Sequence, residues 1–474
     1  MIPNINSSKG KPLYEQIYEF YRHAILNNLL KHNHRLPSHR VLAKELGVGN
    51  NTVIRAYEQL VLEGYVKNEK RLGLFVAEIE RRLPFRKSVA NVLTPQNKAV
   101  PQRKKEFAPS QYMVDEDNFP LKQWRTCSNR ALDSMNFQYE EHARNDGLKE
   151  QLIKYLLEHR GVRASQERLI VGSGATSLLF WLAFVLKRKY SRMAVENPGY
   201  MRVASIFSEL TFNVIPVPVQ RDGIDIKQLM KIKVDAVHVT PSHQYPTGAI
   251  MPVNNRVRIL NWAARNNVYI IEDDFDCEFR HKTTLMPSLQ ALDQRNRVIY
   301  LGSFSNSLMP SLRVGYLVLP EAFEVPYQSL IYLTNTVPYL TRRTLALFME
   351  EGFWERHLKK MRLLYQKKHM LCIKTLSGLP KKLFNFHPTP CGLNILLSIR
   401  SELTETELIQ RALHNGIIVT GTRQFYHGKK IQMPYPEVLL EFGGIPEEKI
   451  EIVIQKLFNA WFQGPLGSTV KAGL

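Results

Sequence analysis

One stretch decides the fold: Tyr300-Leu-Gly-Ser-Phe-Ser-Asn-Ser-Leu-Met-Pro-Ser-Leu-Arg-Val-Gly-Tyr316. It overlaps an apolar run from Val298 to Leu301, which is typical of a buried β-strand. Ser303 and Ser305 follow in a polar turn, and Arg313 comes shortly after them. Small hydroxyl groups, turn amides and an arginine suit a phosphate monoester, because the planar guanidinium is permanently charged and can donate to two phosphate oxygens. The stretch therefore predicts a phosphate-binding turn at the end of a strand.

The same stretch resembles the cofactor-lysine segment of fold-type I pyridoxal 5′-phosphate (PLP) enzymes, in the form carried by MocR-type transcription regulators. In that family the position of Asn306 is a lysine, whose amine forms a Schiff base with the cofactor aldehyde. An amide nitrogen is not a nucleophile, so Asn306 cannot form this bond. The resemblance implies a PLP site that lacks its covalent anchor.

The chain is strongly basic and long enough for two or three domains. It has 474 residues, 44% of them apolar, and a formal net charge of +21. Residues 1–105 hold 19 Lys and Arg against 8 Asp and Glu, a net of +11, so about half of the excess lies in the first quarter. A basic excess of this kind indicates a polyanionic partner, although it can also serve only solubility.

The cysteines and the N-terminus indicate the compartment. Cys127, Cys277, Cys372 and Cys391 are widely spaced, without a CxxC pair or a histidine at metal-ligand spacing. This pattern favours reduced thiols over a disulfide framework or a metal site. The first residues lack an apolar signal core, and no run of ~18 apolar residues is present to span a membrane. We expect a soluble, cytoplasmic protein.

The first 80 residues predict a helix-turn-helix with a wing. Apolar residues at helical spacing follow Pro12, and a shorter helix is expected between a capping Ser38 and Gly47. A further helix is expected from Asn51 to Gly64. Two short helices joined by a glycine-containing turn form a helix-turn-helix, and the residues on either side of Gly73 are typical of a two-stranded wing.

This region resembles the winged helix-turn-helix of GntR-type regulators from Pro12 to Val76, through the segments LPSxR, LGV, NTVxRAYxxLxxEGY and FV. The resemblance implies double-stranded DNA as partner, with contacts from the N-terminal ends of two helices. Family members often carry Ser-Arg where this chain has Gly49-Asn50, a change that removes a capping hydroxyl and a cation. The expected DNA-contacting residues are Arg40, Asn50, Asn51, Thr52 and Arg55.

Composition divides the chain into four segments. The stretch over 81–114 contains prolines and basic runs without sustained periodicity, which is typical of a linker. We expect a DNA-binding domain over 1–80, this linker, an aminotransferase-like domain for effector binding and dimerisation over 115–464, and a tail over 465–474. In the third segment, apolar β-rich runs alternate with helical stretches, which predicts an α/β fold with a mostly parallel sheet and ligands at the carboxyl ends of its strands.

Several motifs follow expected strands of this domain. Gly172-Ser-Gly-Ala-Thr-Ser177 precedes an apolar helix, so its backbone amides suit a phosphate. The family implies roles for further side chains: Tyr200 stacks on the cofactor ring, Ser242 borders the cofactor, and Asp273 keeps the pyridine nitrogen protonated. Arg202 is expected near an effector carboxylate. The expected cofactor-binding residues are Gly174, Ala175, Thr176, Tyr200, Ser242, Asp273, Phe275, Ser303, Ser305 and Arg313.

At two further positions, as at Asn306, this chain lacks a side chain that contacts the cofactor or the substrate in the family. Phe275 replaces a tyrosine whose hydroxyl meets the cofactor phenolate oxygen, so a polar contact is lost. Leu439 aligns with an arginine that holds the substrate carboxylate, and no arginine occurs between Lys430 and Leu474. A laboratory substitution at Asn306 alone would also remove the anchor, but the three changes together favour natural divergence.

The resemblance thus implies a homodimeric MocR/GntR-type transcription regulator, and we expect its large domain to sense PLP, a vitamer or an amino-acid-related ligand without a Schiff base. Transamination is not expected, because it requires the lysine as a proton shuttle. Two alternatives stay open: a PLP-dependent aminotransferase fused to a DNA-binding domain, and a constitutive DNA-binding dimer whose large domain is purely structural.

Overall fold

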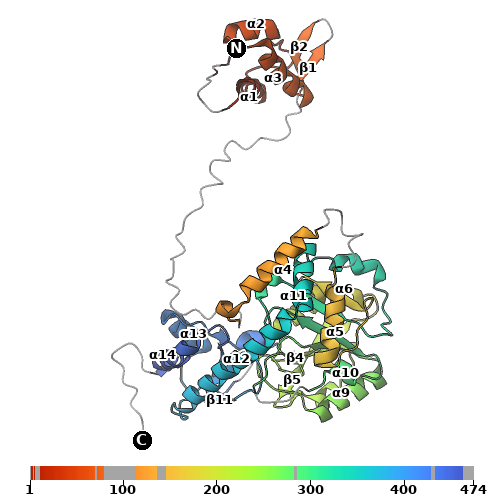
Figure 1. The fold of residues 1–474 in the computed structure, drawn as a ribbon, viewed down its shortest axis with the longest axis vertical. Coiled ribbons are helices and arrows are strands. Elements are labelled where there is room, and N and C mark those ends of the chain that lie inside the picture. The colour runs from red at the N-terminus through yellow and green to blue at the C-terminus, as the bar shows by residue number, and fades with distance from the viewer. Residues whose placement is uncertain are drawn as a thin grey trace. The chain divides into compact units, whose positions relative to one another are not determined.

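A computed structural model describes residues 2–3, 5, 11–69, 72–78, 114–135, 146–281, 286–428 and 433–462. Contacts divide the chain into two compact units, Met1–Gln102 and Arg103–Leu474 (Figure 1). This division falls inside the predicted linker, of which residues 81–113 lie outside the described part, as does the predicted tail over 465–474. None of the helices in the described ranges has the length and apolarity needed to cross a membrane.

The smaller unit is a winged helix-turn-helix, as the sequence predicts. Apolar side chains at helical spacing, Ile17, Tyr21 and Ile25, form its core with residues of the other helices. The Ser38 hydroxyl accepts from the Val41 amide at 3.3 Å, and Gly47 ends the second helix at φ 65°. The elements are α1 (Leu13–Leu26), α2 (His39–Leu46), α3 (Asn50–Leu62) and an antiparallel pair, β1 (Val66–Glu69) and β2 (Gly73–Val76).

The larger unit contains an eight-stranded sheet with the order β3-β10-β9-β8-β7-β4-β5-β6. The five strands β9, β8, β7, β4 and β5 are parallel, whereas β10 runs antiparallel to both β3 and β9. The strands are β3 (Leu169–Gly172), β4 (Arg192–Asn197), β5 (Asn213–Gln220), β6 (Gly223–Ile224), β7 (Ala236–Val239), β8 (Tyr269–Asp273), β9 (Val298–Ser303) and β10 (Gly315–Val318). The predicted mostly parallel sheet is therefore confirmed.

Helices cover both faces of this sheet, because alternate strand residues point to opposite sides. Ile271 and Ile299 are buried against α6 and α7, whereas Ile270 and Val298 are buried against α9 and α10. The helices are α4 (Leu121–Asp133), α5 (Leu148–Arg160), α6 (Ala175–Leu186), α7 (Met201–Glu209), α8 (Ile226–Leu229), α9 (Val253–Asn266), α10 (Leu289–Leu292), α11 (Tyr339–Glu350), α12 (Phe353–Ser377), α13 (Glu405–His414) and α14 (Ile450–Phe462).

A second, antiparallel sheet completes the larger unit. Its order is β11-β12-β14-β13, with β11 (Phe384–Phe386), β12 (Asn394–Ile399), β13 (Thr420–Gly421) and β14 (Glu437–Glu441). One face of this sheet is buried against α12, α13 and α14. Figure 1 shows the long helix α12 extending toward α13, α14 and β11. The opposite face of β14 carries alternate residues, among them Leu439 and Glu441.

Candidate functional site

The predicted phosphate-binding end of the site lies where the start of α6 meets Arg313. Helix α6 begins at Ala175, so the amides of Ala175 and Thr176 lie in its first turn, where they have no helical acceptor. A Cβ atom on Gly174, whose φ is +84°, would lie 2.8 Å from a guanidinium nitrogen of Arg313. Glycine at this position is thus what lets the arginine reach the helix start. Among the described residues, the guanidinium of Arg313 has no hydrogen-bond or carboxylate partner.

The two predicted serines border the same place. Ser303 is the last residue of β9 and pairs in register with Gly315 of β10. A Cβ atom on Gly315 would lie 3.1 Å from the Ala175 nitrogen, so this strand start meets the start of α6. The Ser305 amide donates to the Ser303 hydroxyl at 3.0 Å. Tertiary structure therefore brings together three predicted groups: the start of α6 with Gly174, the two serines at the end of β9, and Arg313.

Asp273 ends β8 beside a histidine on the neighbouring strand. His238 Nε2 lies 3.3 Å from Asp273 Oδ2, and both side chains are buried. A buried carboxylate with a histidine partner suits the predicted role opposite a ring nitrogen, because the imidazole orients the acid. His238 was not predicted from the sequence; its only signal was its place within an expected buried strand.

Asn306 contacts Asp276, an acid that was not predicted as a site residue. Its Nδ2 donates to Asp276 Oδ1 at 3.3 Å, and Asp276 Oδ2 lies 3.4 Å from His243 Nδ1. Asp276 and His243 are both buried. The ring of Phe275 stacks on His243, with 6.0 Å between centroids, and meets Tyr245 edge-on. Phe275 thus contributes only an apolar ring where a tyrosine would carry a hydroxyl.

Three predicted residues take different places around this centre. Tyr200 is half-buried at the N-terminal cap of α7, and Arg202 is exposed in the first turn of that helix. The Ser242 hydroxyl accepts from Arg160 at 3.1 Å. Arg160 in turn forms a buried ion pair with Asp274 at 2.7 Å. Although burial by itself raises the pKa of Asp274, the guanidinium holds it below its usual value.

The C-terminal sheet contributes Leu439 and a neighbouring acid. Leu439 is fully buried and pairs with Leu396 and Thr420, on the face turned away from the helices. Glu441 lies on this same face, because side chains alternate along a strand. Its Oε1 lies 3.5 Å from the Thr420 hydroxyl. Burial raises the pKa of Glu441 to about 7.

The predicted DNA-contacting residues lie at two helix starts of the smaller unit. Arg40 is exposed in the first turn of α2, Asn50 and Asn51 are exposed at the start of α3, and Thr52 is half-buried. Gly49 caps α3 without a side-chain hydrogen bond, as expected from the missing hydroxyl. The Arg55 guanidinium lies 4.1 Å from the centroid of the Tyr14 ring, which holds it on the surface.

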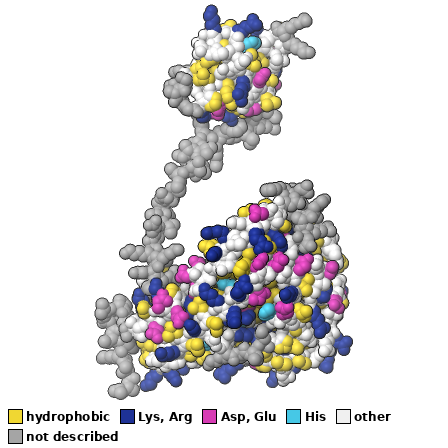
Figure 2. Space-filling view, in the orientation of Figure 1, with side chains coloured by type: hydrophobic (Ala, Val, Ile, Leu, Met, Phe, Trp, Pro, Cys, Tyr) yellow, Lys and Arg dark blue, Asp and Glu magenta, His cyan; other side chains and the backbone are white. Residues whose placement is uncertain are grey.

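Arg35 is a further candidate that the sequence reading missed. Its Nε lies 3.3 Å from the place of a Cβ on Gly73, so it sits beside the turn of the wing. On the face of the larger unit shown in Figure 2, Lys and Arg side chains alternate with Asp and Glu. The basic side chains at the helix starts, together with Arg35 beside the wing, are the candidates for DNA contact.

Comparison with known proteins matches both units. The aminotransferase class I and II family matches residues 104–457, and the gntR family of bacterial regulatory proteins matches residues 13–76. The HTH-type transcriptional regulator YdeL of Bacillus subtilis is 34% identical over 463 residues, covering 97% of this chain and 99% of that protein. A probable rhizopine catabolism regulatory protein, MocR of Rhizobium meliloti, is 29% identical and covers 95% of this chain and 94% of its own.

A solved structure supports the fold of the larger unit. An archaeal alanine:glyoxylate aminotransferase superposes with a TM-score of 0.67 at 22% identity, covering 74% of this chain and 89% of that one. The aminotransferase family binds PLP, and its fold-type I architecture is the one observed here. The chain therefore belongs to the MocR-type transcriptional regulators, in which a GntR-family helix-turn-helix region is joined to an aminotransferase class I and II domain.

Proposed function

We propose that this DNA-binding regulator controls transcription at a promoter or operator as a homodimer, and that its large domain senses PLP or a related vitamer without covalent attachment. The observation that carries the proposal is the contrast between the two ends of one site. At the phosphate end, Arg313 reaches the start of α6 over Gly174. At the other end, Asn306 is bound to Asp276 and offers no nucleophile.

The residues fit PLP at its phosphate and its ring nitrogen, but they lack the covalent anchor and the hydroxyl that would meet the phenolate oxygen. The amides of Ala175 and Thr176, the serines and Arg313 would hold the phosphate, and Asp273 would keep a proton on the pyridine nitrogen. Bound PLP supplies an electron-withdrawing ring that stabilises negative charge on an attached group. Asn306 can orient a ligand by hydrogen bonding but cannot move a proton as a lysine does. We therefore expect ligand binding to serve regulation.

The dimer is supported by exposed aromatic residues near the phosphate end. Phe180 and Phe184 lie one turn apart on α6 and are 52% and 42% exposed. Tyr332, in the adjoining 3-10 helix η6 (Gln328–Thr334), is 69% exposed. Apolar side chains gathered in this way commonly mark a protein interface, and a dimer would suit two DNA half-sites. Sedimentation of the full-length protein checks this part of the proposal.

The first test is titration of the full-length protein with PLP, followed by borohydride reduction and intact-mass measurement. We expect saturable binding that leaves no mass increase. A stable mass increase would show that another lysine binds the aldehyde and would favour the aminotransferase alternative, which the retained Asp273–His238 pair also supports. Absence of binding would favour the constitutive alternative, in which the large domain is only structural.

Sensing requires that ligand and DNA influence each other. The affinity for a DNA duplex, selected from random sequence by the protein itself, should change when PLP is present at saturation. By thermodynamic linkage, the affinity for PLP must change by the same factor when DNA is bound. Equal DNA affinities with and without bound PLP would contradict regulation by this ligand while leaving DNA binding intact.

A further inference from the structure

A buried acid, Glu441, lies on the β14 face that also carries Leu439. Glu441 is 7% exposed and projects from the same strand face as Leu439. The Glu441 Oε2 atom has no hydrogen-bond partner among the described residues, and Oε1 has only the Thr420 hydroxyl, at 3.5 Å. No Lys or Arg of the described ranges forms an ion pair with this carboxylate. A buried carboxylate left this way is costly unless a cation meets it.

A second buried carboxylate, Asp276, comes from the segment that follows β8 of the large sheet. One of its oxygens accepts from Asn306, while the other lies 3.4 Å from His243 and has no hydrogen bond. Asn306 is neutral, and no Lys or Arg of the described ranges forms an ion pair with Asp276. The position that holds a lysine in the family is thus an amide beside an acid.

Tyr245 is influenced by both carboxylates. Burial raises the pKa of its hydroxyl, and the negative charges of Glu441 and Asp276 raise it further. Its ring also meets Phe275, next to Asp276, and Phe425, in the segment that follows β13, with centroids 6.0 and 4.9 Å away. Tyr245 therefore packs between the segments that follow β8 and β13, and both acids act on its hydroxyl. We call Asp276, Glu441, Tyr245 and Asn306 the acidic end of the site.

We propose that the site selects a phosphate monoester that also carries a protonated primary amine, with the phosphate at Arg313 and the ammonium at the acidic end. The proposal rests on the ligand-sensing function above and specifies the class of ligand. An ammonium group is a compact charge with three donors, enough to meet Asp276, Glu441 and the Asn306 side-chain oxygen. Leu439 contributes no charge, so a free carboxylate has no clamp there. The site would therefore prefer an amine to an aldehyde, an alcohol or an acid.

Two vitamers that differ at one group provide the test. Pyridoxamine 5′-phosphate carries an aminomethyl group that is protonated near neutral pH, and pyridoxine 5′-phosphate carries a hydroxymethyl group in its place. Their affinities for the full-length protein are measured by calorimetric titration at pH 8. Glu441 is ionised at this pH, because burial raises its pKa only to about 7. We expect the amine to bind roughly 10-fold or more tightly, the effect of one charge-assisted hydrogen bond.

Variants then assign the preference to the acidic end. Glu441→Gln keeps the shape of the side chain and should reduce the preference for the amine several-fold, with the affinity for pyridoxine 5′-phosphate unchanged. Asp276→Asn should act in the same direction. Glu437→Gln is the matched control, because Glu437 lies on the same face of β14 but pairs with Ser398 at its other end. It should leave both affinities unaltered.

The outcomes separate this inference from the proposed function. Equal binding of the two vitamers, or a preference that Glu441→Gln does not change, would overturn the amine selectivity and leave vitamer sensing intact. Failure of both vitamers to bind would overturn the selectivity and the proposed ligand together. A tighter affinity for the amine that falls in Glu441→Gln and not in Glu437→Gln would establish the inference.

Discussion

Asn306, at the position where the family resemblance places a lysine, donates a hydrogen bond to Asp276 over 3.3 Å. The side chain at position 306 is thereby turned toward a buried acid at the centre of the site. A lysine there would place its amine beside the same carboxylate, within reach of a ligand held by Arg313. Position 306 offers no nucleophile, but Asp276 lies where it would contact a longer side chain at this position.

The variant Asn306→Lys should therefore regain covalent PLP binding. We expect a visible absorbance band on adding PLP, and a mass increase of one cofactor after borohydride reduction. Asn306→Gln is the control, because it has a side chain of intermediate length and no amine. If Asn306→Lys binds PLP without a mass increase, the side chain at 306 does not reach the cofactor carbonyl and the assignment of the site is wrong.

Arg256 should be among the most important residues for the stability of the larger unit. Its side chain is fully buried and donates to the carbonyl oxygens of Met251, Pro287 and Pro241 at 2.8 to 2.9 Å. Arg256→Met would leave the carbonyl oxygens of Met251 and Pro287 without this donor, whereas that of Pro241 still accepts from the Met251 amide. The loss should lower the free energy of unfolding by about 2–4 kcal/mol. The midpoint of urea unfolding measures the loss. Arg265 is an exposed arginine on the same helix. Arg265→Ala should change the free energy of unfolding by less than about 0.5 kcal/mol.

Glu441 should make stability depend on pH in a defined direction. Its pKa rises from the ordinary 4.5 to about 7 on folding, mainly through burial. A folded state that binds the proton more tightly than the unfolded state loses stability as pH rises from about 4.5 to 7. Glu441→Gln cannot ionise at this position. Above pH 7 its free energy of unfolding should therefore be about 3 kcal/mol greater than that of the wild type, and below pH 4 the two should be equal. Parallel unfolding curves at every pH would contradict the burial of this acid.

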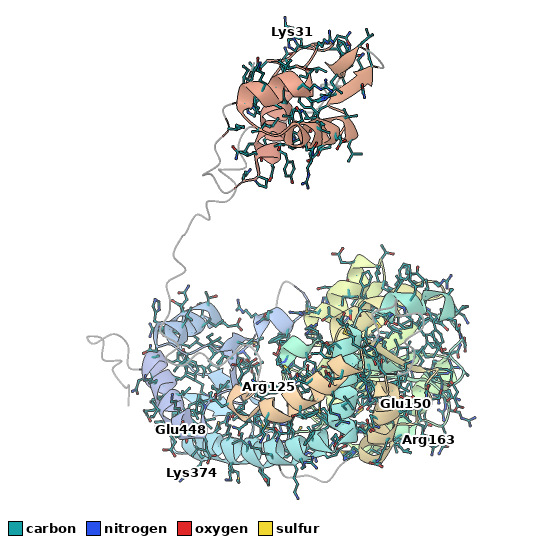
Figure 3. All side chains as sticks on the ribbon, turned by 45° about the horizontal axis from the view of Figure 1, so that its top comes forward. Lys31, Arg125, Glu150, Arg163, Lys374 and Glu448 are labelled. Atoms are coloured by element: carbon teal, nitrogen blue, oxygen red, sulfur yellow. The ribbon has the colours of Figure 1, made fainter. Side chains whose placement is uncertain are left out.

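Arg40→Ala should weaken DNA binding without regard to sequence. An arginine that meets a backbone phosphate adds about one unit to the slope of log affinity against log salt concentration. We expect that slope to fall by about one unit in the variant, as measured by fluorescence anisotropy across a salt series. Lys374→Ala is the control, because this exposed lysine lies on α12 of the larger unit (Figure 3). An unchanged slope for Arg40→Ala would remove Arg40 from the phosphate contacts.

The local elements were predictable because their signals are short-range. Ser38 and Gly47 mark the two ends of one helix through a capping hydroxyl and a left-handed backbone, and both act within a few residues. Strand β9 and its serine-rich turn were likewise predicted from an apolar run and its polar end. The strand alternation that places Leu439 and Glu441 on one face was present in the sequence as well, but the acid was not recognised.

Sequence alone predicted the two kinds of domain, and it shows an amide at Asn306 that is not a nucleophile, because residue type and local spacing carry these properties. Only the tertiary structure decided which distant groups meet. Arg313 reaches Gly174 because β3 and β9 flank β10, Asp273 meets His238 because β7 and β8 are neighbours, and Ser242 contacts Arg160. Asp276 and Glu441, 165 positions apart in the chain, act on one tyrosine. Charge and hydrogen bonding depend on distance in space, which strand order and sheet packing fix and local sequence does not.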